Sequence, residues 1–150
     1  MVRRAKGIDI DQILVLLDQV NRIHANSRPD IFNVATKYSK VELENKIENE
    51  PIFVYVDNDK VLGYIFGLIL DNHSRLLKDN KTFFIDDFCV DENYRGKHIG
   101  STLYEEVKKY AKSIDCKRIT LNVWSFNDNA YRFYTYLGLK PLETVMEEKI

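Results

Sequence analysis

The chain is short of several residue types that mark specialised classes of protein. Its 150 residues include only two cysteines, three prolines and six glycines. Cys89 and Cys116 form no CxxC pair and have no histidine at zinc-ligand spacing, so neither a disulfide framework nor a metal site is expected. Two buried, reduced thiols in a cytoplasmic protein are the simpler interpretation.

The sequence also lacks a long apolar run and an excess of charge of one sign. The longest apolar run, residues 61–70, has about half the roughly 20 residues that span a bilayer. Residues 1–10 carry no apolar stretch typical of a secretory signal. Lys and Arg number 22 and Asp and Glu number 23, which gives a net charge of −1. Because nucleic-acid binding usually needs a clear basic excess, RNA binding through Arg3, Arg4 and Lys6 is a weak hypothesis, and no membrane partner is expected.

The periodicity of the apolar residues that are present predicts one α/β domain (α+β in some classification schemes) over residues 1–150. Strand-like runs precede and follow helix-like stretches in the order β α α β β β α β α β. The predicted strands cover 2–5, 51–56, 61–70, 82–90, 117–124 and 142–150. Antiparallel runs followed by a β-α-β crossover predict a mixed, mostly antiparallel twisted sheet of about six or seven strands, with helices on both faces.

A glycine-rich corner joins the strand at 82–90 to the helix that follows it. The string "VDENYRGKHIG" places Gly96 and Gly100 beside the basic residues Arg95 and Lys97. The N–H groups at a helix N-terminus are unpaired and carry partial positive charge, and glycine lets the backbone approach a ligand closely, so the corner suits a phosphate. An ordinary strand-to-helix turn with solvated basic residues is the alternative. The P-loop string is absent, and the glycine spacing does not fit the dinucleotide fingerprint.

This corner resembles the acetyl-CoA-binding signature of the GNAT N-acetyltransferase superfamily, Q/R-x-x-G-x-G/A after a strand that ends in valine. Arg95 fills the first position and Gly100 the last, while His98 stands where the family usually has glycine. Histidine is among the residues that tolerate a positive φ, so the turn is expected to keep its shape. The string "NDNAYRFYTYLGL" resembles a second family segment, N-x-x-A-x-x-x-Y-x-x-x-G-F/L. "IDDFCV" and "YRGKHIG" are locally similar to strings of spermidine/spermine acetyltransferases.

The resemblance implies transfer of an acetyl group from acetyl-CoA to a primary amine, either a small polyamine-like molecule or a peptide amine, without a metal. Main-chain amides at the corner would hold the pyrophosphate, and main-chain groups of the preceding strand would hold the pantetheine arm. The implied cofactor-binding residues are Phe88, Val90, Arg95, Gly96, Lys97, His98, Ile99, Gly100, Ser101 and Asn127. A non-catalytic CoA-binding or protein-interaction module on the same fold is the alternative.

Catalysis of this kind needs a base for the amine and an acid for the leaving thiolate. An alkyl amine with a pKa of about 10.4 is almost entirely protonated at pH 7. Asp86 aligns with the glutamate that serves as base in the spermidine/spermine-like string, and Asp87 is the second choice or a binder of a cationic substrate. As neighbours on one strand they are expected to point to opposite faces, and a structural carboxylate is the alternative. Tyr134 is the implied acid, unless it only packs with Tyr131 and Phe133.

The acceptor region implied by the resemblance is made by the first two helices, their connecting loop and the last strands. The side chains expected to line it are Phe32, Tyr38, Trp124 and Phe126. His24 and His73 are weaker candidates for the base. The oligomeric state is open, and pairing of the last strand across a homodimer is one arrangement that the sequence allows.

Overall fold

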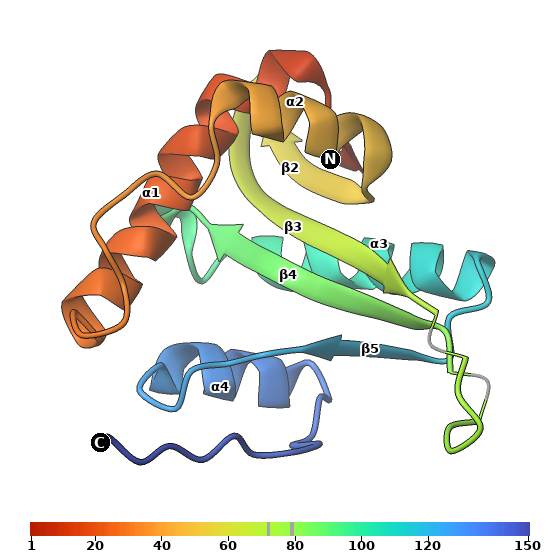
Figure 1. The fold of residues 1–150 in the computed structure, drawn as a ribbon. Helices are drawn as coiled ribbons and strands as arrows, with labels where there is room; N and C mark the ends of the chain where they lie inside the picture. The colour runs from red at the N-terminus through yellow and green to blue at the C-terminus, as the bar shows by residue number, and fades with distance from the viewer. Residues whose placement is uncertain (72, 79) are drawn as a thin grey trace.

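A five-stranded sheet with helices on both faces makes up the part of the chain that the computed structural model describes, residues 1–71, 73–78 and 80–150 (Figure 1). The strands are β1 (Val2–Arg4), β2 (Ile52–Asp57), β3 (Lys60–Leu70), β4 (Thr82–Val90) and β5 (Arg118–Leu121). The helices are α1 (Ile10–Ser27), α2 (Lys40–Asn49), α3 (Ile99–Ser113) and α4 (Asp128–Tyr136). Short 3₁₀ turns, η1 (Gly7–Asp9) and η2 (Glu92–Tyr94), precede α1 and α3. No helix in these described ranges is long and apolar enough to cross a membrane.

The sheet is mixed and its strands follow one another in chain order. β1, β2, β3 and β4 pair antiparallel, whereas β4 and β5 pair parallel through the crossover that contains α3. The β2–β3 hairpin turns through Asn58 and Asp59, both at positive φ, as the favoured two-residue turns require. The predicted mixed sheet and α/β class are confirmed.

The predicted count of six or seven strands is wrong, because residues 142–150 do not form a strand. Every residue of this segment is exposed, so no buried face selects an extended pairing against β5. Ion pairs attach it instead to the end of α1, where Arg28 contacts Glu147 at 2.7 Å and Asp30 contacts Lys149 at 3.0 Å. The strand predicted at 117–124 is also shorter, ending at Leu121.

Two apolar layers enclose the sheet. On one face, α1 and α2 pack on side chains of β2 and β3, and on the opposite face α3 packs on β3 and β4 (Figure 1).

Cys89 is buried in the first layer, where removal from water raises the pKa of its thiol to about 12, and Cys116 is free and half-buried. Ser39 and Glu42 form a capping box at the start of α2. Asp9 occupies the N-cap position of α1 but does not cap it through its side chain, because its carboxylate accepts two hydrogen bonds from Arg3.

Candidate active site

The corner between β4 and α3 has the turn geometry that the glycine-rich string predicts. Gly96 lies at φ +77° and His98, the residue before α3, at φ +60°. His98 therefore adopts the left-handed conformation that glycine would adopt at this position, and the expectation that histidine tolerates it is confirmed. A Cβ added at Gly96 would meet nothing within 4 Å, whereas at Gly100 it would lie 2.7 Å from Cζ of Phe133. Gly100 is thus needed for the close packing of α3 against α4.

This corner presents a set of unpaired main-chain donors. No described residue accepts a hydrogen bond from the main-chain N–H groups of residues 96–101, and the first paired donor is Thr102, which bonds to the carbonyl of His98 at 3.0 Å. Arg95 and Lys97 are exposed beside them. The Lys97 ammonium lies 4.9 Å from the ring centre of Tyr94, and Arg95 Nε donates to the carbonyl of Val90 at 3.3 Å. Free amides at a helix N-terminus with two cations nearby fit a diphosphate.

β4 and β5 separate along their length. β4 pairs with β3 as far as Val90, but with β5 only from Thr82 to Ile85. From Asp86 onward, the main-chain edge of β4 that faces away from β3 therefore has no strand partner among the described residues. α4 closes the far side of this opening, where the ring centres of Phe133 and Tyr134 lie 5.5 Å and 6.1 Å from that of Phe88. The opening exposes main-chain groups beside Phe88 and Val90, the residues expected to contact a pantetheine arm.

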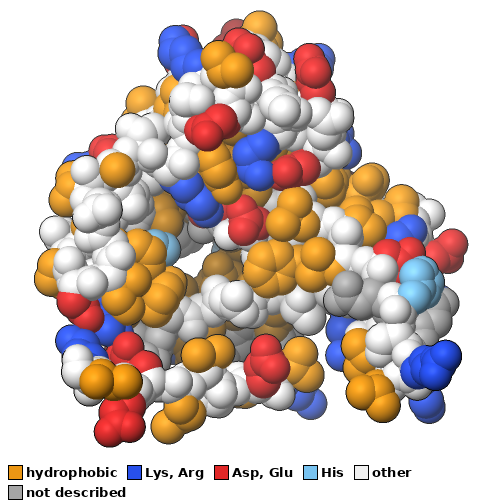
Figure 2. Space-filling view, in the orientation of Figure 1, with side chains coloured by type: hydrophobic (Ala, Val, Ile, Leu, Met, Phe, Trp, Pro, Cys, Tyr) orange, Lys and Arg blue, Asp and Glu red, His pale blue; other side chains and the backbone are white. Residues whose placement is uncertain are grey.

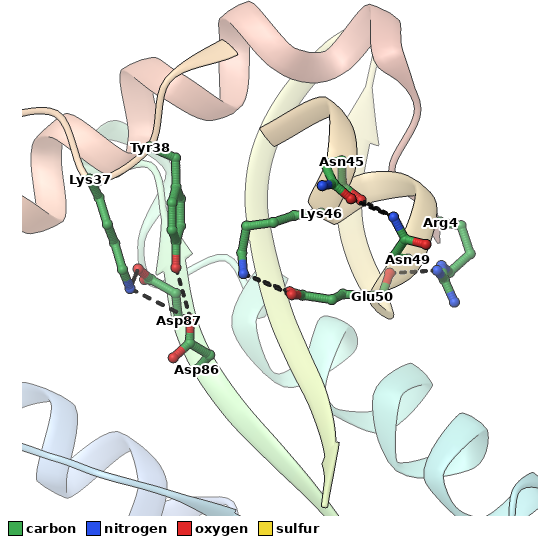
Figure 3. A network of polar contacts seen from close by, with 9 residues as sticks. All are labelled: Arg4, Lys37, Tyr38, Asn45, Lys46, Asn49, Glu50, Asp86 and Asp87. Carbon is green, nitrogen blue, oxygen red and sulfur yellow. Dashed lines mark hydrogen bonds and ion pairs between the residues drawn. The ribbon is translucent and has the colours of Figure 1, made fainter. Parts of the chain in front are cut away.

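A β-bulge in β4 places both acidic residues on the same side. Phe66 of β3 is opposite Asp87 and Gly67 is opposite Ile85, so Asp86 is the extra residue. The prediction that Asp86 and Asp87 point to opposite faces is wrong for this reason, since a bulge interrupts the alternation of a regular strand. The ammonium of Lys37 confirms their shared side, because it lies 2.7 Å from Asp87 Oδ2 and 3.8 Å from Asp86 Oδ2 (Figure 3).

The two carboxylates have different partners. The buried Asp87 accepts hydrogen bonds from Lys37 and, at 3.1 Å, from the hydroxyl of Tyr64. The half-buried Asp86 accepts one from the hydroxyl of Tyr38 at 3.0 Å (Figure 3). Neither Lys37 nor Tyr64 was among the predicted site residues. Lys37 lies in the loop between α1 and α2, where the sequence carries no periodic signal. Tyr64 lies in a continuous apolar run that is buried on both faces of the sheet, so no alternation in the sequence assigns it to one face.

Tyr134 of α4 also lies within the field of Asp87. Burial raises the pKa of its hydroxyl, and the charge of Asp87 raises it further. Its hydroxyl therefore keeps its proton at neutral pH and can only donate one. Asn127 caps α4 through Oδ1, which accepts from the N–H of Ala130 at 3.1 Å, so its amide nitrogen is free to donate to a ligand.

Four rings from distant parts of the chain form an aromatic cluster beside the carboxylates: His24, Phe32, Trp124 and Phe126. Their neighbouring ring centres are 5.0–6.4 Å apart. Figure 2 shows hydrophobic side chains on the borders of a hollow between the parts of the molecule that contain α1 and β4. Three of the four residues predicted to line an acceptor site meet here, while Tyr38 stacks on Phe66 with ring centres 5.9 Å apart. Tyr38 also lines a separate cavity of about 300 Å³ against α2.

The environment of His24 predicts a loss of stability in mild acid. Burial lowers the pKa of His24, the charge of Asp87 opposes this, and the charge of Lys37 adds to it. The unfolded chain, with a histidine pKa of about 6.5, then binds more protons than the folded chain, so stability falls as the pH drops below that value. We expect the melting temperature to fall less between pH 7 and pH 5 in His24→Gln than in the unmodified protein.

A matched control is His98→Asn, which changes an exposed histidine to another residue that tolerates positive φ. It should keep the full pH dependence. An unaltered pH dependence in His24→Gln would show that the charge of His24 does not differ between the folded and unfolded states.

Other candidates from the sequence lie outside this site. His73 is exposed and lies 3.3 Å from Asp71, and Arg3 pairs with Asp9 at 2.7 Å. No group of three or more potential metal ligands occurs among the residues that the structure describes. The candidate site thus consists of the corner between β4 and α3, the opening beside β4, the carboxylate pair, Tyr134 and the aromatic cluster.

Comparison with known proteins identifies a family and several relatives. The profile of the acetyltransferase (GNAT) family matches residues 17–139. The chain is 25% identical over 138 residues to a spermine/spermidine N(1)-acetyltransferase of Bacillus subtilis, covering 90% of this chain and 86% of that one. It is 28% identical over 153 residues to a thialysine N-epsilon-acetyltransferase of Bos taurus, and the alignment covers 95% of this chain and 85% of that one. A crystal structure of a mutant BH1408 protein from Bacillus halodurans superposes with a TM-score of 0.96 at 28% identity. The superposition covers 100% of this chain and 99% of that one.

Proposed function

The chain belongs to the acetyltransferase (GNAT) family and is an N-acetyltransferase, and we propose on this basis that it moves the acetyl group of acetyl-CoA to a primary amine. The observation that carries the proposal is the bulge in β4, which brings two carboxylates to one side of the strand where β4 leaves β5. Acetyl-CoA would supply a thioester as the acyl donor. The chain would supply the binding groups and the two proton-transfer groups.

The groups that would hold the donor are mostly main-chain groups. The free N–H groups of residues 96–101 would bind the diphosphate, with Arg95 and Lys97 adding positive charge. The edge of β4 beside Phe88 and Val90 would hydrogen-bond the pantetheine arm, and the free amide nitrogen of Asn127 would donate to the same arm. These contacts require the turn geometry of Gly96 and His98 more than any particular side chain.

We assign the base to Asp86 and a binding role to Asp87. Both oxygens of Asp87 already accept hydrogen bonds, from Lys37 and Tyr64, and its side chain is only 6% exposed. The half-buried Asp86 accepts a single hydrogen bond from described residues, from Tyr38, so it retains capacity to take a proton from an amine, directly or through water. The buried charge of Asp87 would attract the amine in its cationic form.

Tyr134 is proposed as the acid that protonates the leaving thiolate. Its hydroxyl carries a proton at neutral pH, as an ordinary tyrosine does, and it lies on the helix that borders the opening beside β4. Its raised pKa adds to the free-energy cost of giving up that proton. Proton transfer to a thiolate, with a thiol pKa of about 8.5, is uphill for any tyrosine and would be coupled to cleavage of the C–S bond.

The acceptor class that this site favours is a small cationic amine. Two carboxylates on one side attract positive charge, and the aromatic cluster offers ring faces for cation–π contact. The relatives named for spermine, spermidine and thialysine act on amines of this chemical class. We therefore propose a polyamine-like or lysine-like acceptor.

Binding of the donor should be measurable as thermal stabilisation. At a concentration one hundred times the dissociation constant, acetyl-CoA should add about 2.7 kcal/mol to the free energy of unfolding. For a domain of this size, the melting temperature should rise by roughly 5–10 °C. The measurement is a thermal melt with and without acetyl-CoA, with adenosine at the same concentration as the control. Equal melts with and without the donor would contradict the proposed function.

Turnover should then be measured as release of free thiol with a panel of amines: spermidine, spermine, lysine, an aminoglycoside and a peptide. We expect the highest kcat/KM with the polyamines or lysine-like amines. Stabilisation by acetyl-CoA without thiol release on any amine would favour a non-catalytic CoA-binding module instead.

A further inference from the structure

Lys37 occupies a position that an acceptor amine would be expected to take. Its ammonium lies 2.7 Å from Asp87, 3.8 Å from Asp86 and 5.4 Å from the ring centre of Tyr38 (Figure 3). The carboxylates belong to the bulge of β4, whereas Lys37 reaches them from the loop between α1 and α2. Its side chain is 38% exposed, so the amine lies at the boundary between solvent and the buried Asp87.

The other lysines that form ion pairs are held elsewhere. Lys40 pairs with Asp11, Lys46 with Glu50, Lys60 with Asp91, Lys108 with Glu105, Lys109 with Glu106 and Lys149 with Asp30. Within residues 1–71, 73–78 and 80–150, Lys37 is the one lysine whose amine contacts Asp86 and Asp87. The arrangement is therefore specific to one side chain and does not reflect a general excess of positive charge.

We propose that Lys37 is a self-acetylation site, at which the enzyme transfers an acetyl group from acetyl-CoA to its own Lys37 amine in the absence of another acceptor. The inference rests on the proposed function. If an acceptor amine loses its proton at the carboxylates of β4, then the amine already present there is that of Lys37.

The reaction balances with acetyl-CoA as the only co-reactant. The ammonium of Lys37 gives one proton to a carboxylate of the pair, and the nitrogen attacks the carbonyl carbon of the thioester. The N–C bond forms as the C–S bond breaks, and the electron pair of that bond leaves on sulfur. The nitrogen then loses a second proton to water as the amide forms. Tyr134 protonates the sulfur and regains a proton from water, while the carboxylate releases its proton to water. The products are acetylated Lys37, the free thiol of CoA and one proton in solution.

The experiment is incubation of the full chain with acetyl-CoA and no amine, followed by the intact mass of the protein and mapping of the acetylated peptide. We expect the mass to rise by one acetyl group per chain, at Lys37. Because the transfer is within one chain, its rate constant should not change when the protein is diluted. Lys37→Arg keeps a cation beside both carboxylates and should abolish the mass increase. Lys40→Arg, three residues away and more exposed, should leave it unaltered.

Chemical acetylation provides the second control. An acetyl N-hydroxysuccinimide ester, applied without CoA, should label Lys112 ahead of Lys37, because Lys112 is exposed and has no ion-pair partner among the described residues, whereas the Lys37 amine is held in an ion pair. With acetyl-CoA in place of the ester, the order in which the lysines are acetylated should be reversed, with Lys37 first. The same order with both reagents would overturn the proposal, as would a rate constant that rises with protein concentration.

Failure of the inference and failure of the proposed function give different results. Thiol release with a polyamine but no acetyl group on Lys37 would overturn self-acetylation alone. A protein that shows neither stabilisation by acetyl-CoA nor thiol release on any amine would overturn both.

Discussion

Tyr134→Phe is expected to lower kcat for the best acceptor by about 10²–10⁴-fold, the usual contribution of a general acid. The substitution removes only the hydroxyl, which burial and the charge of Asp87 keep protonated. The ring contacts with Phe88 and Phe133 are retained, at 6.1 Å and 5.7 Å between ring centres. The measurement is steady-state release of free thiol at saturating amine.

The same variant should bind the donor as the unmodified protein does, so its thermal stabilisation by acetyl-CoA should not change. Tyr131→Phe is a matched control, because Tyr131 lies on the same helix and its side chain is 47% exposed. It should retain full turnover. Equal kcat in Tyr134→Phe and Tyr131→Phe would show that Tyr134 is not the acid and that its ring only packs between α4 and Phe88.

Gly67→Ala should produce the second large effect, a fall in stability. A Cβ at Gly67 would collide with three atoms of the Phe83 ring, coming within 2.6 Å of Cε1 and 2.8 Å of Cε2. Phe83 is fully buried and cannot move aside. Overpacking of this kind costs about 1–3 kcal/mol, and each kcal/mol lowers the melting temperature by about 2–4 °C at this size. Thermal melting of the purified variant measures the effect.

Gly67 also lies at the register shift that creates the bulge, so turnover should fall together with stability. Gly7→Ala is the control, because a Cβ at Gly7 meets nothing within 4 Å, and it should alter stability by no more than about 0.5 kcal/mol. If both alanine variants melt at the same temperature, the sheet can relax around Phe83 and the bulge does not depend on this glycine.

The sequence was informative where function depends on main-chain geometry. The spacing of Gly96 and Gly100 and the position of His98 predict a turn with positive φ and free amides. The structure has both features at these residues. Such features are local, because the positions of the glycines constrain the backbone directly. They can therefore be predicted without knowing which distant segments are in contact.

The predictions that failed, or that were not made, depend on contacts between distant segments. The shared side of Asp86 and Asp87 follows from a one-residue bulge, which is defined by pairing with β3 and leaves no mark in the letters of β4. The position of Lys37 depends on how a loop 50 residues earlier in the chain folds over that strand. Residues 142–150 were predicted as a further strand, but all of them are exposed, so no buried face selects their pairing with β5.

The separation of β4 from β5 has a consequence for how such an enzyme diversifies. An extended ligand that lies along the free edge of β4 bonds to peptide groups, which every residue except proline provides alike. Substitutions at positions 88 and 90 can then accumulate without loss of the donor, provided that proline does not appear there. If the loop between α1 and α2 borders the acceptor as proposed, variation in that loop would change which amine is accepted, and the donor and acceptor sites would then evolve independently.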